Sequence, residues 1–216
     1  MDIEGKLYLH EIWLQNPRSG QQADFTGADL EWADFSGKNL SKVVFRYANL
    51  TKAKFASANL TGAEFDGALL NQTDFTQTTL DHSSFAYAII DSANFHMSSA
   101  VHAIFQDALI VSSLLTHCDL KGSNFKNIRG YESMFTKSNL TEASFQGAKL
   151  LASAMNWTTL DGANLQNTEV LLADFTGASM LGTSITHTDF SGSIIDDHQL
   201  ENAKHNFFLH DDLELE

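Results

Sequence analysis

The fold is decided by a stretch that reads ADFTGADLEWADFSGKNL over residues 23–40. Large apolar residues stand at positions 25, 30, 35 and 40, and the same spacing continues as far as Ile195. Between residues 25 and 195 there are 35 positions numbered in multiples of five, and only Ala100 and Gly130 are not large and apolar. A fixed period sustained over so much of the chain is typical of a repeat protein.

A small residue precedes each apolar centre by two places. This residue is Ala 17 times, Ser 8 times and Thr 6 times, and the exceptions are Lys38, Val43, Cys118 and Ile128. On an α-helix, steps of five would turn successive centres by roughly 140° and scatter them. On a strand, residues two apart share a face. Both residues can therefore point inward if the chain turns a corner in each unit. Gly stands two places after the centre ten times, at the place where a tight corner favours it.

The number of walls follows from a second period, because Phe and Leu alternate at the centres. A coil of three units would place Phe in every column, whereas a coil of four units stacks Phe on two opposite walls. We therefore predict an all-β, quadrilateral, parallel β-helix of nearly nine coils, about 42 Å long at about 4.8 Å per coil. Its core is predicted to include one column of stacked rings: Phe25, Phe45, Phe65, Phe85, Phe105, Phe125 and Phe145.

These units resemble the pentapeptide-repeat family, whose motif is A(D/N)LXX. The motif is matched by Ala28-Asp29-Leu30, Ala48-Asn49-Leu50 and Ala163-Asn164-Leu165. The resemblance covers residues 23–195 and implies a right-handed β-helix with capped, often dimerising, ends. Some members protect DNA gyrase from quinolones and look like acidic rods that imitate duplex DNA. The resemblance therefore implies DNA gyrase as a candidate partner.

Three segments are expected along the chain. Residues 1–22 form an N-terminal cap, in which KLYLHEIWLQN (residues 6–16) could place Leu7, Tyr8, Ile12 and Trp13 on one helical face. Residues 23–195 form the β-helix. Residues 196–216 are acidic and contain scattered apolar side chains, so they could cap the last coil, pair with a second subunit or form a tail.

Composition narrows the class of partner. Lys and Arg number 13 and Asp and Glu number 27, a net charge of −14 that disfavours direct contact with nucleic acid or an anionic membrane. The sequence contains no apolar run of about 18 residues and no secretory signal, and it has one cysteine, Cys118. We expect a cytoplasmic protein whose partners are other proteins.

Catalytic and metal-binding motifs are missing from the sequence. Cys118 takes an inward place and is interpreted as a structural thiol. His82 and His102 stand twenty residues apart, on adjacent coils, but Gly62 and Gly122 occupy the flanking coils, so no third metal ligand is evident. We predict a non-catalytic protein without a cofactor or a metal.

The clearest candidate site is an apolar stripe on the wall centred on residues 30, 50 and so on to 190. Its outward positions should carry seven apolar side chains: Leu69, Ile89, Leu109, Val111, Tyr131, Leu151 and Leu171. A contiguous exposed apolar surface marks an interface. The alternative is that these residues only strengthen a flat sheet through β-propensity. Outward apolar residues on the other walls, among them Leu114 and Met134, look isolated.

Ile128 and Gly130 invert the usual order of a small residue followed by a large one. We expect a local irregularity here: Ile128 could fill the volume left at Gly130, and Gly130 could adopt a positive φ that bends the strand outward. Tyr131 should then lie in a protein contact, most simply a homodimer. DNA mimicry is the alternative function. The acids of residues 55–120 are spread over all four walls, however, and almost half of the net charge lies in the last 21 residues.

Overall fold

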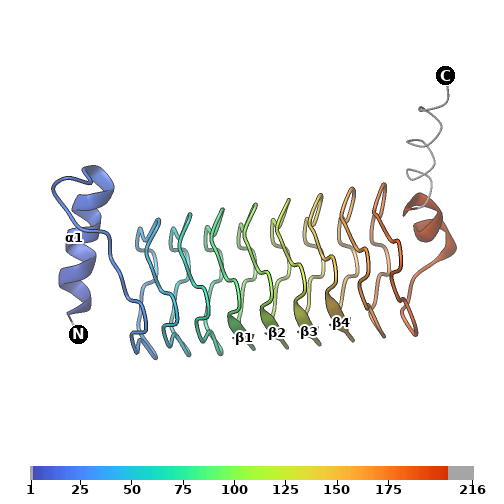
Figure 1. The fold of residues 1–216 in the computed structure, drawn as a ribbon, viewed down its shortest axis with the longest axis horizontal. Coiled ribbons are helices and arrows are strands. Elements are labelled where there is room, and N and C mark those ends of the chain that lie inside the picture. The colour runs from blue at the N-terminus through green and yellow to red at the C-terminus, as the bar shows by residue number, and fades with distance from the viewer. Residues whose placement is uncertain (1, 204–216) are drawn as a thin grey trace, which may run out of the picture.

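The computed structural model describes residues 2–203, which form an elongated rod of stacked coils (Figure 1). Helix α1 (Ile3–Gln15) lies across the N-terminal end of the rod, and a second helical segment, residues 197–203, lies at the other end. Within residues 2–203, no helix is both long enough and apolar enough to span a bilayer.

Successive coils are joined by parallel β-bridges between residues twenty positions apart, such as Asp29 with Asn49 and Thr79 with Ser99. The coil of four walls predicted from the Phe and Leu alternation is therefore confirmed. On the wall centred on residues 30 to 190, which we call the stripe wall, the bridges extend into a parallel sheet in the order β1-β2-β3-β4. Its strands are β1 (Ile89–Asp91), β2 (Leu109–Val111), β3 (Arg129–Tyr131) and β4 (Lys149–Leu151).

The interior is filled by the apolar centres. All seven phenylalanines of the predicted column lie inside the rod, with at most 1% of each residue exposed. Rings on adjacent coils are stacked, with centroid separations from 4.7 Å for Phe105 and Phe125 to 5.3 Å for Phe25 and Phe45. A second Phe column faces the first from the opposite wall, so that Phe75 meets Phe85 edge-on. The rod is thus a close-packed solid without a lumen.

Each corner is turned by the residue two places after a centre, which has a positive φ. The ten glycines predicted at this place adopt this backbone, and so do 24 residues with side chains, among them Trp32 and Tyr47. A left-handed backbone is unfavourable for such residues. It is held here because the corner N–H is bonded to the next coil, as Tyr47 N–H is to Asp66 O at 2.9 Å.

Polar residues of the repeat complete the backbone hydrogen bonding. The Asp or Asn before a centre accepts the N–H of the residue two places on, as Asp34 Oδ1 does from Ser36 at 2.9 Å. Inward Ser and Thr donate to a carbonyl of the preceding coil, as Thr73 Oγ1 does to Leu50 O at 2.9 Å. These bonds explain why hydroxyl groups are tolerated in the interior.

The helical cap expected over residues 6–16 is α1. Its first turn is capped by Asp2, whose Oδ1 accepts Gly5 N–H at 2.9 Å. Leu7 and His10 are buried, and His10 Nδ1 accepts Ala23 N–H at 3.1 Å, which joins the helix to the first coil. The prediction that Tyr8 shares the buried face was wrong. Tyr8 follows the buried Leu7 by one residue, which turns it about 100° around the helix, and it is 65% exposed.

The C-terminal end is partly covered by residues 197–203. Gln199 is buried there, and its Nε2 donates to Phe175 O at 2.7 Å and to Ala178 O at 2.9 Å. The further roles considered for the acidic segment fall mainly on residues 204–216, which lie outside the described residues.

The local irregularity expected at Ile128 and Gly130 is not observed. Strand β3 pairs in register with β2 and β4, and Gly130 does not have a positive φ. The reason is steric: a Cβ at Gly130 would lie 2.8 Å from Leu150 Cδ2 and 3.9 Å from Ile128 Cδ1. These two side chains occupy the space of the missing one, so the coil continues without a bend.

Candidate functional site: the apolar stripe

All seven residues of the apolar stripe point outward on the stripe wall. Leu69, Ile89, Tyr131 and Leu151 are between 37% and 39% exposed, and the other three are half-buried. Leu69, Ile89 and Leu109 form one column before the centres, and the remaining four form the column after them. The stripe therefore crosses the wall diagonally, and the two columns meet in β2.

Further apolar residues lie beyond one corner of the stripe wall, past the exposed Ser112 and Glu132 at the corner itself. Leu114 and Met134, which looked isolated in the sequence, are bridged to each other on the next wall. They follow Val111 and Tyr131 by three residues, just beyond the corner, and are 39% and 43% exposed. Leu172 stands at the same corner beside Leu171. We call Leu114, Met134 and Leu172 the corner extension. In the sequence, Leu114 and Met134 could have been found by their spacing of three residues from Val111 and Tyr131 across a corner.

The stripe wall is electrically balanced over its apolar part. From residue 69 to residue 171 its outward positions carry two acids, Asp91 and Glu169, and two bases, Arg129 and Lys149, for a net charge of zero. Lys149 Nζ lies 2.9 Å from Glu169 Oε1. These two side chains form the polar side of a shallow groove that Tyr131, Leu151 and Leu171 also line. In a chain of net charge −14, this wall offers an apolar surface without charge excess.

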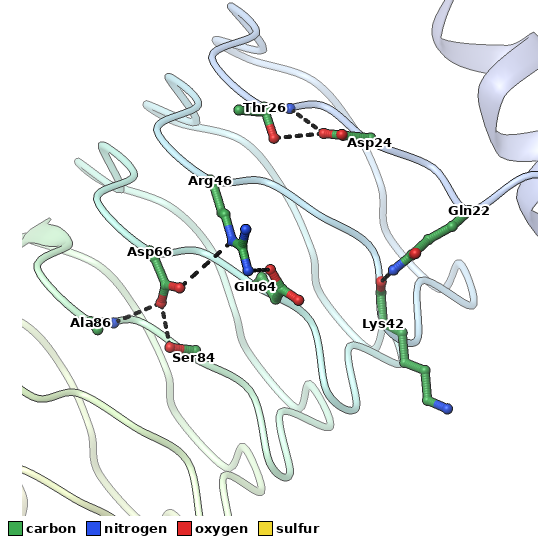
Figure 2. A network of polar contacts seen from close by, with 9 residues as sticks. All are labelled: Gln22, Asp24, Thr26, Lys42, Arg46, Glu64, Asp66, Ser84 and Ala86. Atoms are coloured by element: carbon green, nitrogen blue, oxygen red, sulfur yellow. Dashed lines mark hydrogen bonds and ion pairs between the residues drawn. The ribbon is translucent and has the colours of Figure 1, made fainter.

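The acids of a neighbouring wall are engaged in internal contacts. Figure 2 shows Arg46 between Glu64 and Asp66, at N···O distances of 2.6 and 3.8 Å. Asp66 also accepts Ala86 N–H at 3.2 Å and the Ser84 hydroxyl. These carboxylates therefore stabilise adjacent coils and do not form a free row of negative charge.

The histidine and cysteine candidates show no assembled centre. His82 and His102 are stacked with ring centroids 5.5 Å apart, and residues 2–203 contain no group of three or more potential metal ligands. Cys118 is buried, and burial raises the pKa of its thiol. Its Sγ lies 2.9 Å from Phe95 O, as the inward Ser and Thr hydroxyls do at equivalent places.

Fold and surface together define a solenoid that presents flat outer walls. The family model for pentapeptide repeats matches residues 23–62, 58–96, 113–150 and 153–197, and the chain belongs to the pentapeptide-repeat family. No relative among the curated proteins matches the sequence.

Two solved structures show the same fold at low sequence identity. One is HetL, a pentapeptide repeat protein involved in heterocyst differentiation regulation from the cyanobacterium Nostoc sp. strain PCC 7120. It is 16% identical with a TM-score of 0.51, over 85% of this chain and 91% of HetL. The other is QnrB1, a plasmid-mediated fluoroquinolone resistance protein. It is 18% identical with a TM-score of 0.53, over 81% of this chain and 95% of QnrB1.

Proposed function

We propose that the protein is a non-catalytic scaffold that recognises another protein through its stripe wall. The observation that carries this proposal is the apolar stripe itself, seven outward apolar side chains on adjacent coils, along a part of the wall (residues 69–171) whose outward positions carry no net charge. Exposed contiguous apolar surface is unfavourable in water and marks interaction sites.

The alternative explanation, β-propensity alone, accounts for less of the pattern. It would favour apolar outward residues on every wall, since all four are built of the same bridges. Beside the centres, the stripe wall carries seven such residues, whereas each other wall carries two or three: Val44 and Ile104, Leu114, Met134 and Ile194, and Val101 and Leu181. Parallel strands that are apolar on both faces, such as Leu109-Ile110-Val111, are characteristic of sheets covered on both sides.

Affinity capture from the native cytosol tests the proposal. The bait is the full chain, compared with Tyr131→Ser/Leu151→Ser, which removes apolar surface from the stripe wall. The matched control is Val101→Ser/Leu181→Ser on the opposite wall, centred on residues 40, 60 and so on to 180. We expect proteins retained by the wild type and the control to be lost from the stripe variant. Equal retention by all three would reject the stripe wall.

DNA gyrase is a second candidate partner, suggested by the family resemblance, the net charge of −14 and the fold shared with QnrB1. A duplex as long as the rod carries roughly 25 phosphates at one per about 1.7 Å. The acids here are spread over four walls, and Glu64 and Asp66 are paired with Arg46. Mimicry predicts that the protein inhibits gyrase supercoiling, or protects gyrase from quinolones, at low salt and less so as salt rises. No effect at micromolar protein would exclude gyrase.

A further inference from the structure

We infer that the occupant of the stripe wall is a second copy of this chain, packed wall against wall with the two rods crossed. This inference rests on the proposed function and names its partner. The first argument is the shape of the surface: β1 to β4 form a regular parallel sheet with apolar residues on both faces. A flat sheet is best covered by another flat sheet, with the two sheets about 10 Å apart.

The second argument is the direction of the stripe. From Leu69 to Leu171 it advances five coils, about 24 Å, while it shifts sideways by two residues, about 7 Å. The stripe is therefore tilted by about 15° from the rod axis. A twofold axis parallel to the stripe, between two facing walls, lays the stripe of one copy on the stripe of the other. The two rods then cross at about 30°, the angle common for packed, aligned sheets.

The third argument is electrostatic. Arg129, Lys149 and Glu169 lie on one side of the stripe, and Asp91 lies on the other. Rotation about the stripe carries the bases of the second copy to the opposite side, away from those of the first. It also brings Asp91 of the second copy to the side of Arg129, two coils or about 10 Å away along the stripe. The outward positions from residue 69 to residue 171 sum to zero charge, so two chains of −14 can meet along the stripe without a local excess of like charge; Asp29, Glu31 and Asp189 lie beyond its ends.

The mass in solution tests this inference. Light scattering over a range of concentrations should give twice the chain mass for the wild type and for Val101→Ser/Leu181→Ser. Tyr131→Ser/Leu151→Ser should stay folded by circular dichroism, because neither side chain points inward, but should weaken dimerisation at least tenfold. A wild type that stays monomeric at several hundred micromolar overturns the inference, as does a stripe variant that dimerises normally.

Cross-linking tests the geometry. Leu151 lies close to the expected axis, so Leu151→Cys in a Cys118→Ser background should give dimers with a short bismaleimide that spans about 10 Å. Leu181→Cys on the opposite wall is the matched control and should not. Dimers from Leu181→Cys alone would place the contact elsewhere. The wild type could instead be monomeric and still capture proteins in a way that depends on Tyr131 and Leu151. That result would reject a second copy as the partner but would support protein recognition by the stripe wall.

Discussion

Phe85 and Phe105 lie parallel in adjacent coils, with ring centroids 4.8 Å apart and planes 1° from each other. Phe65 stacks on the other side of Phe85, also at 4.8 Å. Phe85→Ala should lower the free energy of unfolding by about 3–5 kcal/mol, because stacked neighbours on both sides cannot close the gap. Denaturant titration measures this. Phe190→Ala, in the less buried last coil, is the control and should have a smaller effect. Equal effects would contradict the interior stack.

Gly130 and Ile128 should be strongly coupled. Gly130→Leu alone should destabilise the protein by about 1–3 kcal/mol, because Leu150 and Ile128 already occupy the space. Ile128→Ala/Gly130→Leu restores the ordinary order of small and large residues, so it should be more stable than the sum of the single changes predicts. A double-mutant cycle measures this coupling, expected at about 0.5–3 kcal/mol. Simple additivity would contradict the volume exchange.

Gly67 and Gly27 form a matched pair, because each turns a corner of the rod with a φ of +65°. An added Cβ at Gly67 would meet Tyr47 Cδ1 at 2.5 Å, whereas at Gly27 no atom lies within 4 Å. Both changes to Ala should lower the melting temperature through the left-handed backbone. Gly67→Ala should lower it further, and Tyr47→Ala should remove that excess. Identical shifts for the two glycines would show that the ring does not rest on Gly67.

His10 should make stability depend on pH. Burial holds the pKa of its imidazole below the ordinary value of 6.5, and Nδ1 must stay unprotonated to accept Ala23 N–H. As pH falls below 6.5, the unfolded chain binds this proton first, so stability is lost between 6.5 and the lower folded pKa. His10→Asn keeps an acceptor in place of Nδ1 but cannot titrate. Its unfolding midpoint should vary less over this range than that of the wild type; equal slopes would assign the effect to other groups.

The fold could be predicted from the sequence because one period specifies both its strands and its corners. A centre such as Phe85 and a small residue such as Ala108 can point inward in every five-residue unit only if the chain turns a corner in each unit. The positive φ of Tyr47 and 23 other residues with side chains was not predictable, since it is imposed by hydrogen bonds between coils and not by the residues themselves. Nor was the exposure of Tyr8, which depends on how α1 docks on the first coil.

The candidate site was predictable only in part. The seven positions of the apolar stripe follow from the twenty-residue coil, because the same outward place recurs in each coil. The corner extension is not visible in the stripe's own columns, since Leu114 and Met134 belong to a different wall. Their nearness to Val111 and Tyr131 follows from a spacing of three residues across a corner, which a count along one wall does not contain.

Photo-cross-linking in the native cell tests the central claim most directly, because it detects any protein on the stripe wall, whether a second copy or another chain. Two variants would be made, one with a photoreactive phenylalanine analogue in place of Tyr131 and the other with the analogue in place of Leu181 on the opposite wall. We predict light-dependent protein adducts at position 131 and few or none at position 181. The absence of adducts at position 131, or equal adducts at both positions, would contradict recognition through the stripe wall.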